Sequence, residues 1–374
     1  MAIIAYLHDG TSIYDHMFLE HLVKRNTVFF LTFHPKPRFI PKEARVTIMR
    51  EPLLFLADKA WIEGIRMYTL FLLRTLLVKL ELRRIKPQLV IGCMATKYGF
   101  YATATSFKPT IAIVWGTDVL ISPRRFLFFR FLAKHTLKKA DAVILDSKVQ
   151  KNAAVQLGCN PDKILKFPWF NEESVKLKSS REETREKLGW SDNVIILSAR
   201  SHEPLYGIEH LIEAIPEIIK TEPNARFLIL GQGRLTPTLK ERVKQLQVSQ
   251  YVRFLGHIPR DEVITYLNSS DINVSTSFSD GTSASLLEAM ALAVPSVVTD
   301  IAGNKEWIES NYNGILTATR NPKDLAGKIV HLAQNQDTRK RLGKNAQTTI
   351  EQKVDWQRNM QTFDSLIQAL IDKK

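Results

Sequence analysis

The sequence contains very little cysteine, and this excludes two classes of protein. Its 374 residues include only Cys93 and Cys159, which lack the close spacing of metal-ligand motifs. One pair also cannot supply the disulfide framework of a small secreted domain. The sequence therefore fits a reducing compartment and domains stabilised by apolar burial.

Long apolar runs are missing as well. Crossing a bilayer takes about 20 apolar residues in a row, and the run at 67–73 is interrupted by Arg74 and then Lys79. The N-terminal run AIIAYL is short, has no basic region before it and is followed by HDG. We expect it to form a first strand and not a signal peptide, and we expect no membrane-spanning segment.

Positive charge is abundant and lies in one half of the chain. Residues 1–170 hold 26 Lys and Arg against 12 Asp and Glu, whereas residues 171–374 hold 26 of each. The net charge of +14 therefore belongs to the first half. Such segregation suggests that the first half meets an anionic partner while the second half has a different task.

Strand-like and helix-like segments alternate along both halves. Apolar runs such as TVFFLTF, TIAIVW, NVIILSA and RFLIL are separated by segments of helical length, among them 59–85 and 123–139. This alternation predicts parallel sheets with helices on both faces. We expect two Rossmann-like α/β domains, at 1–170 and 190–355, joined by the polar segment 168–190.

Ligands of such folds bind beyond the carboxyl ends of the strands, so polar groups in those loops are candidate site residues. Arg200 follows NVIILSA, where a guanidinium can hold phosphate oxygens with two hydrogen bonds. A salt bridge to a nearby carboxylate is its alternative role. Gly231 and Gly233 form a GQG turn that lacks the third glycine of a dinucleotide motif, so it is either a tight turn or a ligand contact.

The stretch DGTSASLLEAMALAVPSVVTD places two carboxylates around a helix start. Thr282 or Ser283 is a suitable N-cap, and the amides that follow can face an anion. Those amides belong to Ser285, Leu286 and Leu287. If the anion is a diphosphate, Glu288 can accept hydrogen bonds from a ribose diol and Asp280 from hydroxyls of an attached sugar. The alternative is an exposed helix residue at Glu288 and a turn-forming Asp280 before Gly281.

The longer run SFSDGTSASLLEAMALAVPSVVTDIAGNKEWI closely resembles the donor-binding signature of retaining GT-B glycosyltransferases, family four in particular. In that family two acids eight positions apart flank the same helix start. The resemblance continues through Arg200, the GQG turn and FLGHIPRDEV to a final helix around DWQRNM. It implies a GT-B fold in which the helix at 356–374 packs back on an acceptor-binding N-terminal domain, while the second domain binds a nucleotide-sugar donor.

The resemblance also implies roles for single positions. Glu288 matches the acid that binds the ribose, Asp280 the acid that faces the donor sugar, and Arg200 the arginine of a diphosphate-binding pair. Tyr206 stands where the lysine of that pair is usual, and Trp115 where many members have a histidine near the reacting sugar. Tyr206 removes one cation, and Trp115 cannot accept a hydrogen bond through its ring nitrogen.

The predicted site has three parts. The catalytic residues are Asp280, Arg200 and Asp118. The donor-binding residues are Glu288, Gly231, Gly233, Gly281, Thr282, Ser285, Leu286, Leu287 and Tyr206. The acceptor-binding residues are Gly10 and Tyr14, from HDGTSIYD after the first strand, and Trp115. Asp118, in WGTD, either orients the acceptor hydroxyl or caps a helix.

The segment SPRRFLFFRFLAKHTLKK at 122–139 combines aromatic and basic residues. Such a helix can lie on an anionic membrane, where each cation contributes up to about 1 kcal/mol. The predicted membrane-contact residues are Arg124, Arg125, Phe128, Phe129, Arg130, Lys134, Lys138 and Lys139. The alternative is that the aromatic rings pack on the sheet while the cations are solvated.

The expected function is a retaining transfer of sugar from a nucleotide-diphosphate sugar, UDP being the commonest in similar proteins, to a glycan or lipid-linked acceptor. The resemblance implies no metal or other cofactor, and the chain contains no Asp-x-Asp pair. We expect a cytoplasmic protein, peripheral at the inner face of the membrane. A non-catalytic binding subunit is the alternative that Tyr206 and Trp115 favour. A nucleic-acid-binding protein has only the basic half in its favour, so we expect no nucleic-acid partner.

Overall fold

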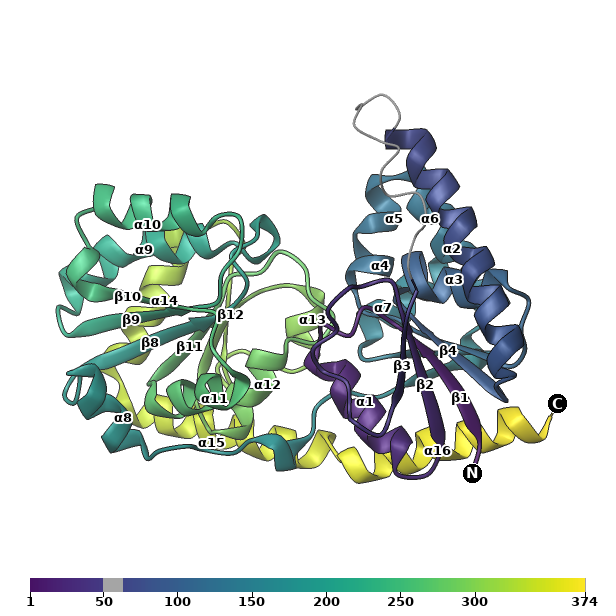
Figure 1. Ribbon diagram of the computed structural model, residues 1–374. Helices are drawn as coiled ribbons and strands as arrows, with labels where there is room; N and C mark the ends of the chain where they lie inside the picture. Colours follow the sequence, from purple (N-terminus) through teal and green to yellow (C-terminus); the bar gives the residue numbers. More distant parts are fainter. Residues whose placement is uncertain (50–62, 374) are drawn as a thin grey trace. The chain divides into compact units, whose positions relative to one another are not determined.

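The computed structural model describes residues 1–49 and 63–373, and the chain forms two compact units. The first unit contains Met1–Pro168 and Gln357–Lys374, and the second contains Trp169–Trp356. In each unit a parallel sheet has helices on both faces (Figure 1). The α/β architecture predicted from the alternating segments is confirmed.

The first unit has a seven-stranded sheet in the order β3-β2-β1-β4-β5-β6-β7. Its strands are β1 (Ile3–Leu7), β2 (Thr27–Thr32), β3 (Arg45–Ile48), β4 (Leu89–Cys93), β5 (Thr110–Ile113), β6 (Ala142–Leu145) and β7 (Ile164–Lys166). Its α-helices are α1 (Ile13–Val23), α2 (Glu63–Ile85), α3 (Gly99–Ala104), α4 (Thr117–Leu120), α5 (Ser122–Arg125), α6 (Leu127–Lys139), α7 (Lys148–Gln156) and, at the C-terminus, α16 (Trp356–Asp372). The last helix packs on α1, where Phe363 meets Phe18 with ring centroids 5.7 Å apart. Asp364 of α16 also lies 2.8 Å from His21.

The second unit has a six-stranded sheet in the order β10-β9-β8-β11-β12-β13. Its strands are β8 (Val194–Ala199), β9 (Ala225–Leu230), β10 (Val252–Gly256), β11 (Ile272–Ser275), β12 (Ser296–Thr299) and β13 (Ile315–Thr317). Its α-helices are α8 (Arg181–Leu188), α9 (Ile208–Thr221), α10 (Thr236–Gln245), α11 (Arg260–Ser269), α12 (Ala284–Ala291), α13 (Ala302–Lys305), α14 (Pro322–Gln334) and α15 (Gln336–Lys353).

The strands of the second unit supply side chains to two core layers. Successive side chains of a strand point to opposite faces of the sheet. Ile196 and Phe227 pack with α9, α10 and α14, whereas Leu197 and Leu228 pack with α8 and α11. All four side chains are fully buried. Because both faces of the sheet are covered, the central strands contain continuous apolar runs, such as VIIL in β8 and FLIL in β9.

Each sheet contains one point where the strand order reverses. The neighbours there are β1 and β4 in the first unit, and β8 and β11 in the second. In doubly wound folds ligands bind at the carboxyl ends of these two strands, because their connections leave toward opposite faces. The loop after β8 carries Arg200, and the loop after β11 carries Asp280. The fold thus places both residues where a ligand is expected.

The polar segment at 168–190 belongs to the second unit from Trp169 onward. Phe170 is buried in a cluster with Leu287 and Trp307. Farther along, α8 packs on α11, and Trp190 joins the core beside it. Most of the segment between the two sheets therefore folds onto the second unit, although its sequence has no strand pattern.

α2 corresponds to the helix that the sequence predicts at 59–85. The observed helix begins at Glu63, and residues 59–62 lie outside the described part of the chain. Within residues 1–49 and 63–373, no helix combines the length and the apolar character that crossing a membrane requires.

Gly343 of α15 provides a test of the packing between α15 and the turn after α12. A methyl group at this position would overlap the backbone oxygen of Ala293, which is not free to move aside. We expect Gly343→Ala to lower the free energy of unfolding by about 1–3 kcal/mol, the usual cost of overpacking. Gly327→Ala in α14 is the control, because a methyl group there meets nothing within 4 Å and should stabilise the helix by up to about 1 kcal/mol. Thermal unfolding followed by circular dichroism checks both, and equal shifts would contradict the close contact.

Candidate active site

Two loops of the second unit are joined by hydrogen bonds. The amide of Phe278 donates to the oxygen of Leu205, and the hydroxyl of Thr276 donates to the oxygen of Tyr206, each at 2.9 Å. Gly207 has a φ of 58° and lies so close to the oxygen of Thr276 that a side chain would clash with it. The loop after β8 and the loop after β11 therefore hold each other in register.

Arg200 and Asp280 form an ion pair across these two loops. Arg200 Nη2 lies 2.5 Å from Asp280 Oδ2, and Nη1 donates to Ser283 Oγ at 2.7 Å. The ring of Tyr206 covers one face of the guanidinium, with its centroid 4.3 Å from Arg200 Cζ. Both charged groups are mostly buried, so solvent screens their attraction weakly. The salt-bridge role left open for Arg200 is observed, and Tyr206 supplies a stacking surface where a second cation is usual.

This arrangement leaves hydrogen-bonding capacity at Arg200. Its Nε is buried and has no hydrogen-bond partner among the described residues. A guanidinium carries five N–H groups in one plane, and the contacts with Asp280 and Ser283 use only two of them. An anion that reaches this loop can therefore bind Arg200 beside Asp280 or in its place.

Helix α12 begins after Ser283, which is its N-cap, so Thr282 lies one position before the cap. The Ser283 side chain accepts no hydrogen bond from a backbone N–H of α12; its oxygen accepts from Arg200 and lies within hydrogen-bond distance, 3.3 Å, of Ser285 Oγ. The N–H groups of the first three helical positions, Ser285 among them, have no acceptor inside the helix. They remain suited to an anion.

The prediction that the amide of Leu287 is free to bind an anion at this helix start was wrong. The amide of Leu287 donates to the oxygen of Ser283 at 3.1 Å, because the fourth helical residue already closes the first turn. The side chains of Leu286 and Leu287 are buried in the apolar core. Of these two residues, only Leu286 has an amide in the part of the helix without internal acceptors.

Glu288 is 4% exposed, which excludes an exposed helix residue at this position. Arg260 donates through Nε to Glu288 Oε1 at 2.8 Å and through Nη1 to Ser174 Oγ at 2.8 Å. Burial raises the pKa of Glu288, and the charge of Arg260 opposes that rise. Arg260 is absent from the predicted site. The signal for it in the sequence was weak, because a cation in the first turn of a helix opposes the helix dipole, and here Asp261 and Glu262 lie in the same turn.

The GQG turn packs directly on the loop after β8. Gly231 has a φ of 99°, and a side chain there would overlap the backbone oxygen of Arg200. A side chain at Gly233 would come within 2.6 Å of the backbone oxygen of His202. These contacts agree with the tight-turn role left open for the two glycines. They also hold the backbone of Arg200 in place.

The loop that carries Asp280 is also supported from the β12 side. Gly303, in α13, approaches the backbone oxygens of Asp280 and Gly281 so closely that a side chain would overlap them. Thr299, at the end of β12, donates to the oxygen of Ser277 at 2.5 Å. Backbone contacts with two neighbouring loops therefore fix the position of Asp280.

The predicted acceptor residues of the first unit include an aromatic contact. His8 and Trp115 stack with ring centroids 4.6 Å apart, and Tyr14 meets Trp115 edge-on at 5.7 Å. His8 Nδ1 lies 2.6 Å from Asp15 Oδ1 and 2.7 Å from Oδ2, with both residues buried. The structure thus brings Tyr14 and Trp115 into direct contact, with His8, which is absent from the predicted site, stacked on the Trp115 ring. The HDG triplet that follows the first strand was the signal for it.

Gly10 and Asp118 are both in close contact with other residues of the first unit. Gly10 has a φ of 68°, and a side chain there would lie 2.7 Å from Pro37. Burial raises the pKa of Asp118 to about 6, and backbone N–H groups oppose that rise. The carboxylate of Asp118 accepts backbone hydrogen bonds at 2.6–3.0 Å from Ala95, Trp115 and Gly116. Both oxygens are therefore occupied inside the unit, and we correct the expected acceptor contact of Asp118 to a structural role that joins the loops after β4 and β5.

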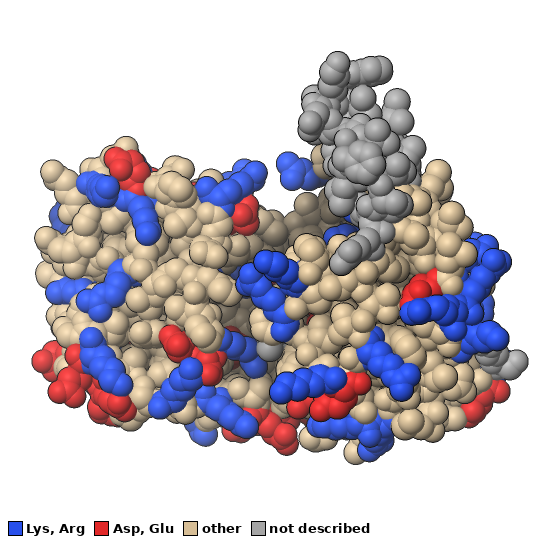
Figure 2. Space-filling view, in the orientation of Figure 1, with Lys and Arg blue, Asp and Glu red and all other residues tan. Residues whose placement is uncertain are grey.

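The basic segment at 122–139 folds as α5 and α6, and its residues divide into two groups. The half-buried members are Phe128, Phe129 and Lys134, and the exposed ones are Arg124, Arg125, Arg130, Lys138 and Lys139. Phe128 packs edge-on against Phe71 of α2 at 5.3 Å. Figure 2 shows groups of Lys and Arg side chains on the first unit, with fewer Asp and Glu among them. The cations are exposed, but so are two of the rings, Phe126 at 56% and Phe131 at 60%, so only part of the packing that the alternative to membrane contact requires is observed.

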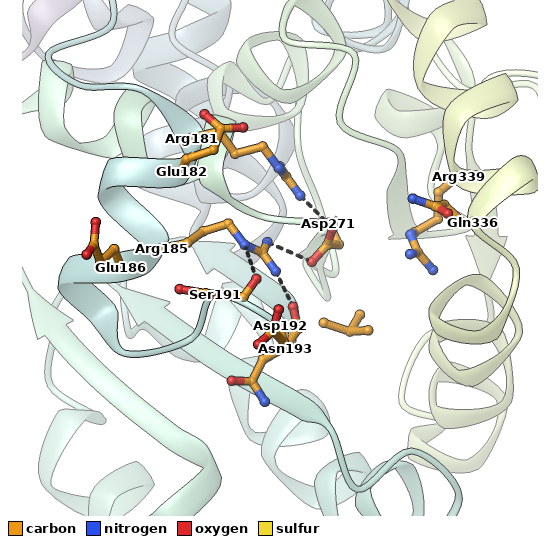
Figure 3. Close-up of a pocket in the computed structure, with 11 residues that line it drawn as sticks. Arg181, Glu182, Arg185, Glu186, Ser191, Asp192, Asn193, Asp271, Gln336 and Arg339 are labelled. Atoms are coloured by element: carbon orange, nitrogen blue, oxygen red, sulfur yellow. Dashed lines mark hydrogen bonds and ion pairs between the residues drawn. The ribbon is translucent and has the colours of Figure 1, made fainter.

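A pocket of about 550 Å³ lies at the amino ends of β8 and β11, away from the loops described above (Figure 3). Arg181 and Arg185 both point toward Asp271, at 2.6 and 3.1 Å. Arg339, on the facing side, donates to two backbone oxygens at the end of α14. These guanidinium groups already bind a carboxylate and backbone oxygens of the same unit, so the pocket offers no anion site comparable to that at Arg200.

The loops at the carboxyl ends of β8 and β11 thus present three kinds of group. They offer a guanidinium with unused N–H groups, a helix start and a buried carboxylate held by an arginine. Such a set suits a ligand that carries an anion next to hydroxyl groups. In the described residues, no three His, Cys, Asp or Glu side chains are grouped so that they could hold a metal ion.

Solved structures share this two-domain architecture. Anabaena Alr3699/HepE, solved in complex with UDP-glucose, superposes with a TM-score of 0.79 at 19% identity, over 99% of this chain and 100% of that one. Two parallel-sheet Rossmann-like domains with such a neighbour define the GT-B class of fold.

The family follows from sequence comparison. Residues 180–349 match the family Glycosyl transferases group 1, and residues 56–147 match Glycosyl transferase 4-like. An uncharacterized glycosyltransferase of Methanocaldococcus jannaschii is 24% identical over 66% of this chain and 63% of its own length. The alpha-monoglucosyldiacylglycerol synthase of Acholeplasma laidlawii is 30% identical over 44% of this chain and 41% of its own, so less than two thirds of either relative is matched. The chain belongs to the group 1 glycosyltransferases with the GT-B fold, as its signature predicts.

The ion pair between Arg260 and Glu288 can be tested by removing one partner. We expect Arg260→Gln to lower the free energy of unfolding at neutral pH by about 3 kcal/mol, because it leaves a buried carboxylate without a counter-charge. The variant should raise the pKa of Glu288 further. A carboxyl group whose pKa is raised by folding binds its proton more tightly in the folded state, so the loss of stability should grow as pH rises and shrink in acid.

The double variant Arg260→Gln/Glu288→Gln is the matched control, since it removes both charges and keeps similar side-chain volumes. Denaturant unfolding at acid and neutral pH should show most of the stability recovered and the pH dependence lost. An equal loss in the single and double variants would contradict the charge pairing.

Proposed function

We propose that this protein transfers a sugar from a nucleotide-diphosphate sugar, with UDP as the favoured nucleotide, to a glycan or lipid-linked acceptor. One observation carries the proposal: Arg200 and the buried Glu288 both lie around the start of α12, at the reversal point of the second sheet. Membership of the group 1 glycosyltransferases supports it. The UDP-glucose complex of the structurally similar Anabaena protein supports the choice of nucleotide.

The proposed donor position uses the groups already described. The diphosphate would lie at the start of α12, where it meets first-turn amides and the unused N–H groups of Arg200. Glu288 would accept hydrogen bonds from the ribose hydroxyls, sharing its charge with Arg260. Asp280 would face the sugar. Because these donors are fixed by backbone contacts, they can stabilise the charge that grows on the leaving diphosphate without rearranging.

We further propose that the transfer retains the anomeric configuration and needs no metal ion or other cofactor. In same-face attack, the acceptor oxygen bonds to the anomeric carbon as the bond to the diphosphate oxygen breaks. The leaving phosphate oxygen takes the acceptor proton, so no enzymic nucleophile is required. Leaving-group stabilisation is then assigned to Arg200 and the helix amides.

The acceptor is assigned to the first unit, which carries the excess of positive charge. The rings of Tyr14, Trp115 and His8, in which Trp115 contacts both of the others, offer apolar surface of the kind that sugars and lipids meet. A related synthase is named for a diacylglycerol product, which supports a lipid-linked acceptor here. We propose that the protein works at the anionic inner face of a membrane, in the assembly of cell-surface polysaccharide, lipopolysaccharide or glycolipid.

A thermal-shift panel of nucleotide sugars tests donor binding. A donor at 100 times its dissociation constant should stabilise the protein by about 2.7 kcal/mol. We expect Glu288→Ala to lower the affinity for that donor by about 1–3 kcal/mol, which is about 5- to 150-fold. Glu217→Ala, which truncates an exposed glutamate of α9, is the control and should bind normally. Equal affinity of Glu288→Ala and the natural chain would contradict the ribose assignment.

The stereochemistry and the metal independence can be tested together. With an α-linked donor, NMR of the fresh product should show an α linkage, and the rate should be unchanged after treatment with a chelator. A β-linked product would contradict retention, and a rate restored only by a divalent cation would contradict metal independence. Neither result would contradict donor binding at α12.

A further inference from the structure

Three arginines line a pocket beside α5 and the start of α6. The pocket has a volume of about 430 Å³, and Arg124, Arg125 and Arg130 contribute its charge. None of the three forms an ion pair with any residue that the structure describes. No carboxylate lines the pocket, whose other walls are apolar except for Gln156. Three uncompensated guanidinium groups around one hollow suit a single multivalent anion such as a phosphate.

An apolar groove lies on the other side of Leu127. It has a volume of about 440 Å³ and is lined by Phe71, Leu72, Phe100, Leu127, Phe128, Phe131 and Leu132. Leu127 is 83% exposed and Leu72 is 73% exposed, although both are large apolar side chains. On α2 the apolar surface continues at Leu76 and Leu80, four and eight residues after Leu72. Exposed apolar surface of this extent is unusual unless something covers it.

Leu127 lines both hollows, so the cationic pocket and the apolar groove are directly adjacent. They share α6, and ring contact between Phe71 and Phe128 joins α6 to α2 in the same unit (Figure 1). A ligand that fits both must carry an anion and a long apolar chain joined at one point. A phospholipid has this construction, whereas inorganic phosphate has no apolar part.

We propose that the two hollows together bind one anionic phospholipid, with its phosphate among Arg124, Arg125 and Arg130 and an acyl chain along the groove between α6 and α2. This is a defined lipid site, distinct from general attraction of a basic helix to a charged surface. It deepens the membrane contact proposed above and rests on it, but it does not depend on sugar transfer. Lys138 and Lys139 lie outside both hollows and do not belong to the site.

Vesicle co-sedimentation with matched charge variants tests the site. The full chain is mixed with phosphatidylcholine vesicles that contain or lack phosphatidylglycerol. We expect binding only with phosphatidylglycerol, and less of it as salt rises. Arg124→Gln/Arg125→Gln should weaken binding about tenfold more than Lys138→Gln/Lys139→Gln, although each pair removes two positive charges from the same basic segment. Equal losses would show diffuse attraction and overturn the proposal.

The apolar half of the site needs its own variant. Leu127→Ser/Phe131→Ser keeps every charge and should also weaken vesicle binding, whereas Leu76→Ser, which lies outside the two hollows, should have less effect. Glycerol phosphate, which carries the headgroup anion without chains, should compete poorly. If it competes as well as the lipid, or if an oligonucleotide displaces the vesicles completely, the two-part lipid site is overturned.

Two measurements keep these outcomes separate from the proposed transfer. Circular dichroism of each variant shows that the fold is intact. The thermal shift with the nucleotide-sugar donor, which binds in the other unit, should be unchanged in all lipid-site variants. Normal lipid binding without a donor response would contradict the transferase function alone, and the reverse would contradict the lipid site alone.

Discussion

Two arginines pair with the two acids around the start of α12, and the rest of the candidate site depends on these pairs. Arg200 holds Asp280, and Arg260 holds Glu288, with both carboxylates largely or fully removed from water. A buried carboxylate without a counter-charge would take up a proton or destabilise the domain. The pairs therefore give both carboxylates a cationic partner and a fixed orientation in the absence of a ligand. Any nucleotide that binds there must share or replace contacts that already exist.

The two ion pairs have a defined geometry because backbone contacts hold in place the loops that carry them. Gly207, Gly231 and Gly303 each approach a neighbouring backbone more closely than any side chain would allow. Four loops, after the adjacent strands β9, β8, β11 and β12, are thus packed on one another, in keeping with the need of preorganised sites for a rigid frame. The cost is intolerance to substitution at positions that touch no ligand.

The fold and the loops that carry Arg200 and Asp280 could be predicted because both depend on local patterns in the sequence. Alternating apolar runs predicted the two sheets. The stretch around LLEAM predicted that Asp280 and Glu288 lie on either side of a helix start. Arg260 could not be placed, since its contact with Glu288 joins residues 28 positions apart and depends on how α11 packs. Asp118 shows the opposite case. A carboxylate in a loop after a strand suggests a ligand contact. Whether backbone amides already donate to that carboxylate depends on the neighbouring π-helical turn at Met94–Tyr98.

The ring of Tyr206 on the guanidinium of Arg200 determines how that cation can be used. The tyrosine ring covers one face of the guanidinium, while the N–H groups that hold Asp280 and Ser283 and that could bind an anion lie in its plane. A lysine at position 206 would instead attract anions from many directions as a mobile point charge. At position 206 this protein therefore has a ring that restricts how Arg200 can move in place of a second positive charge.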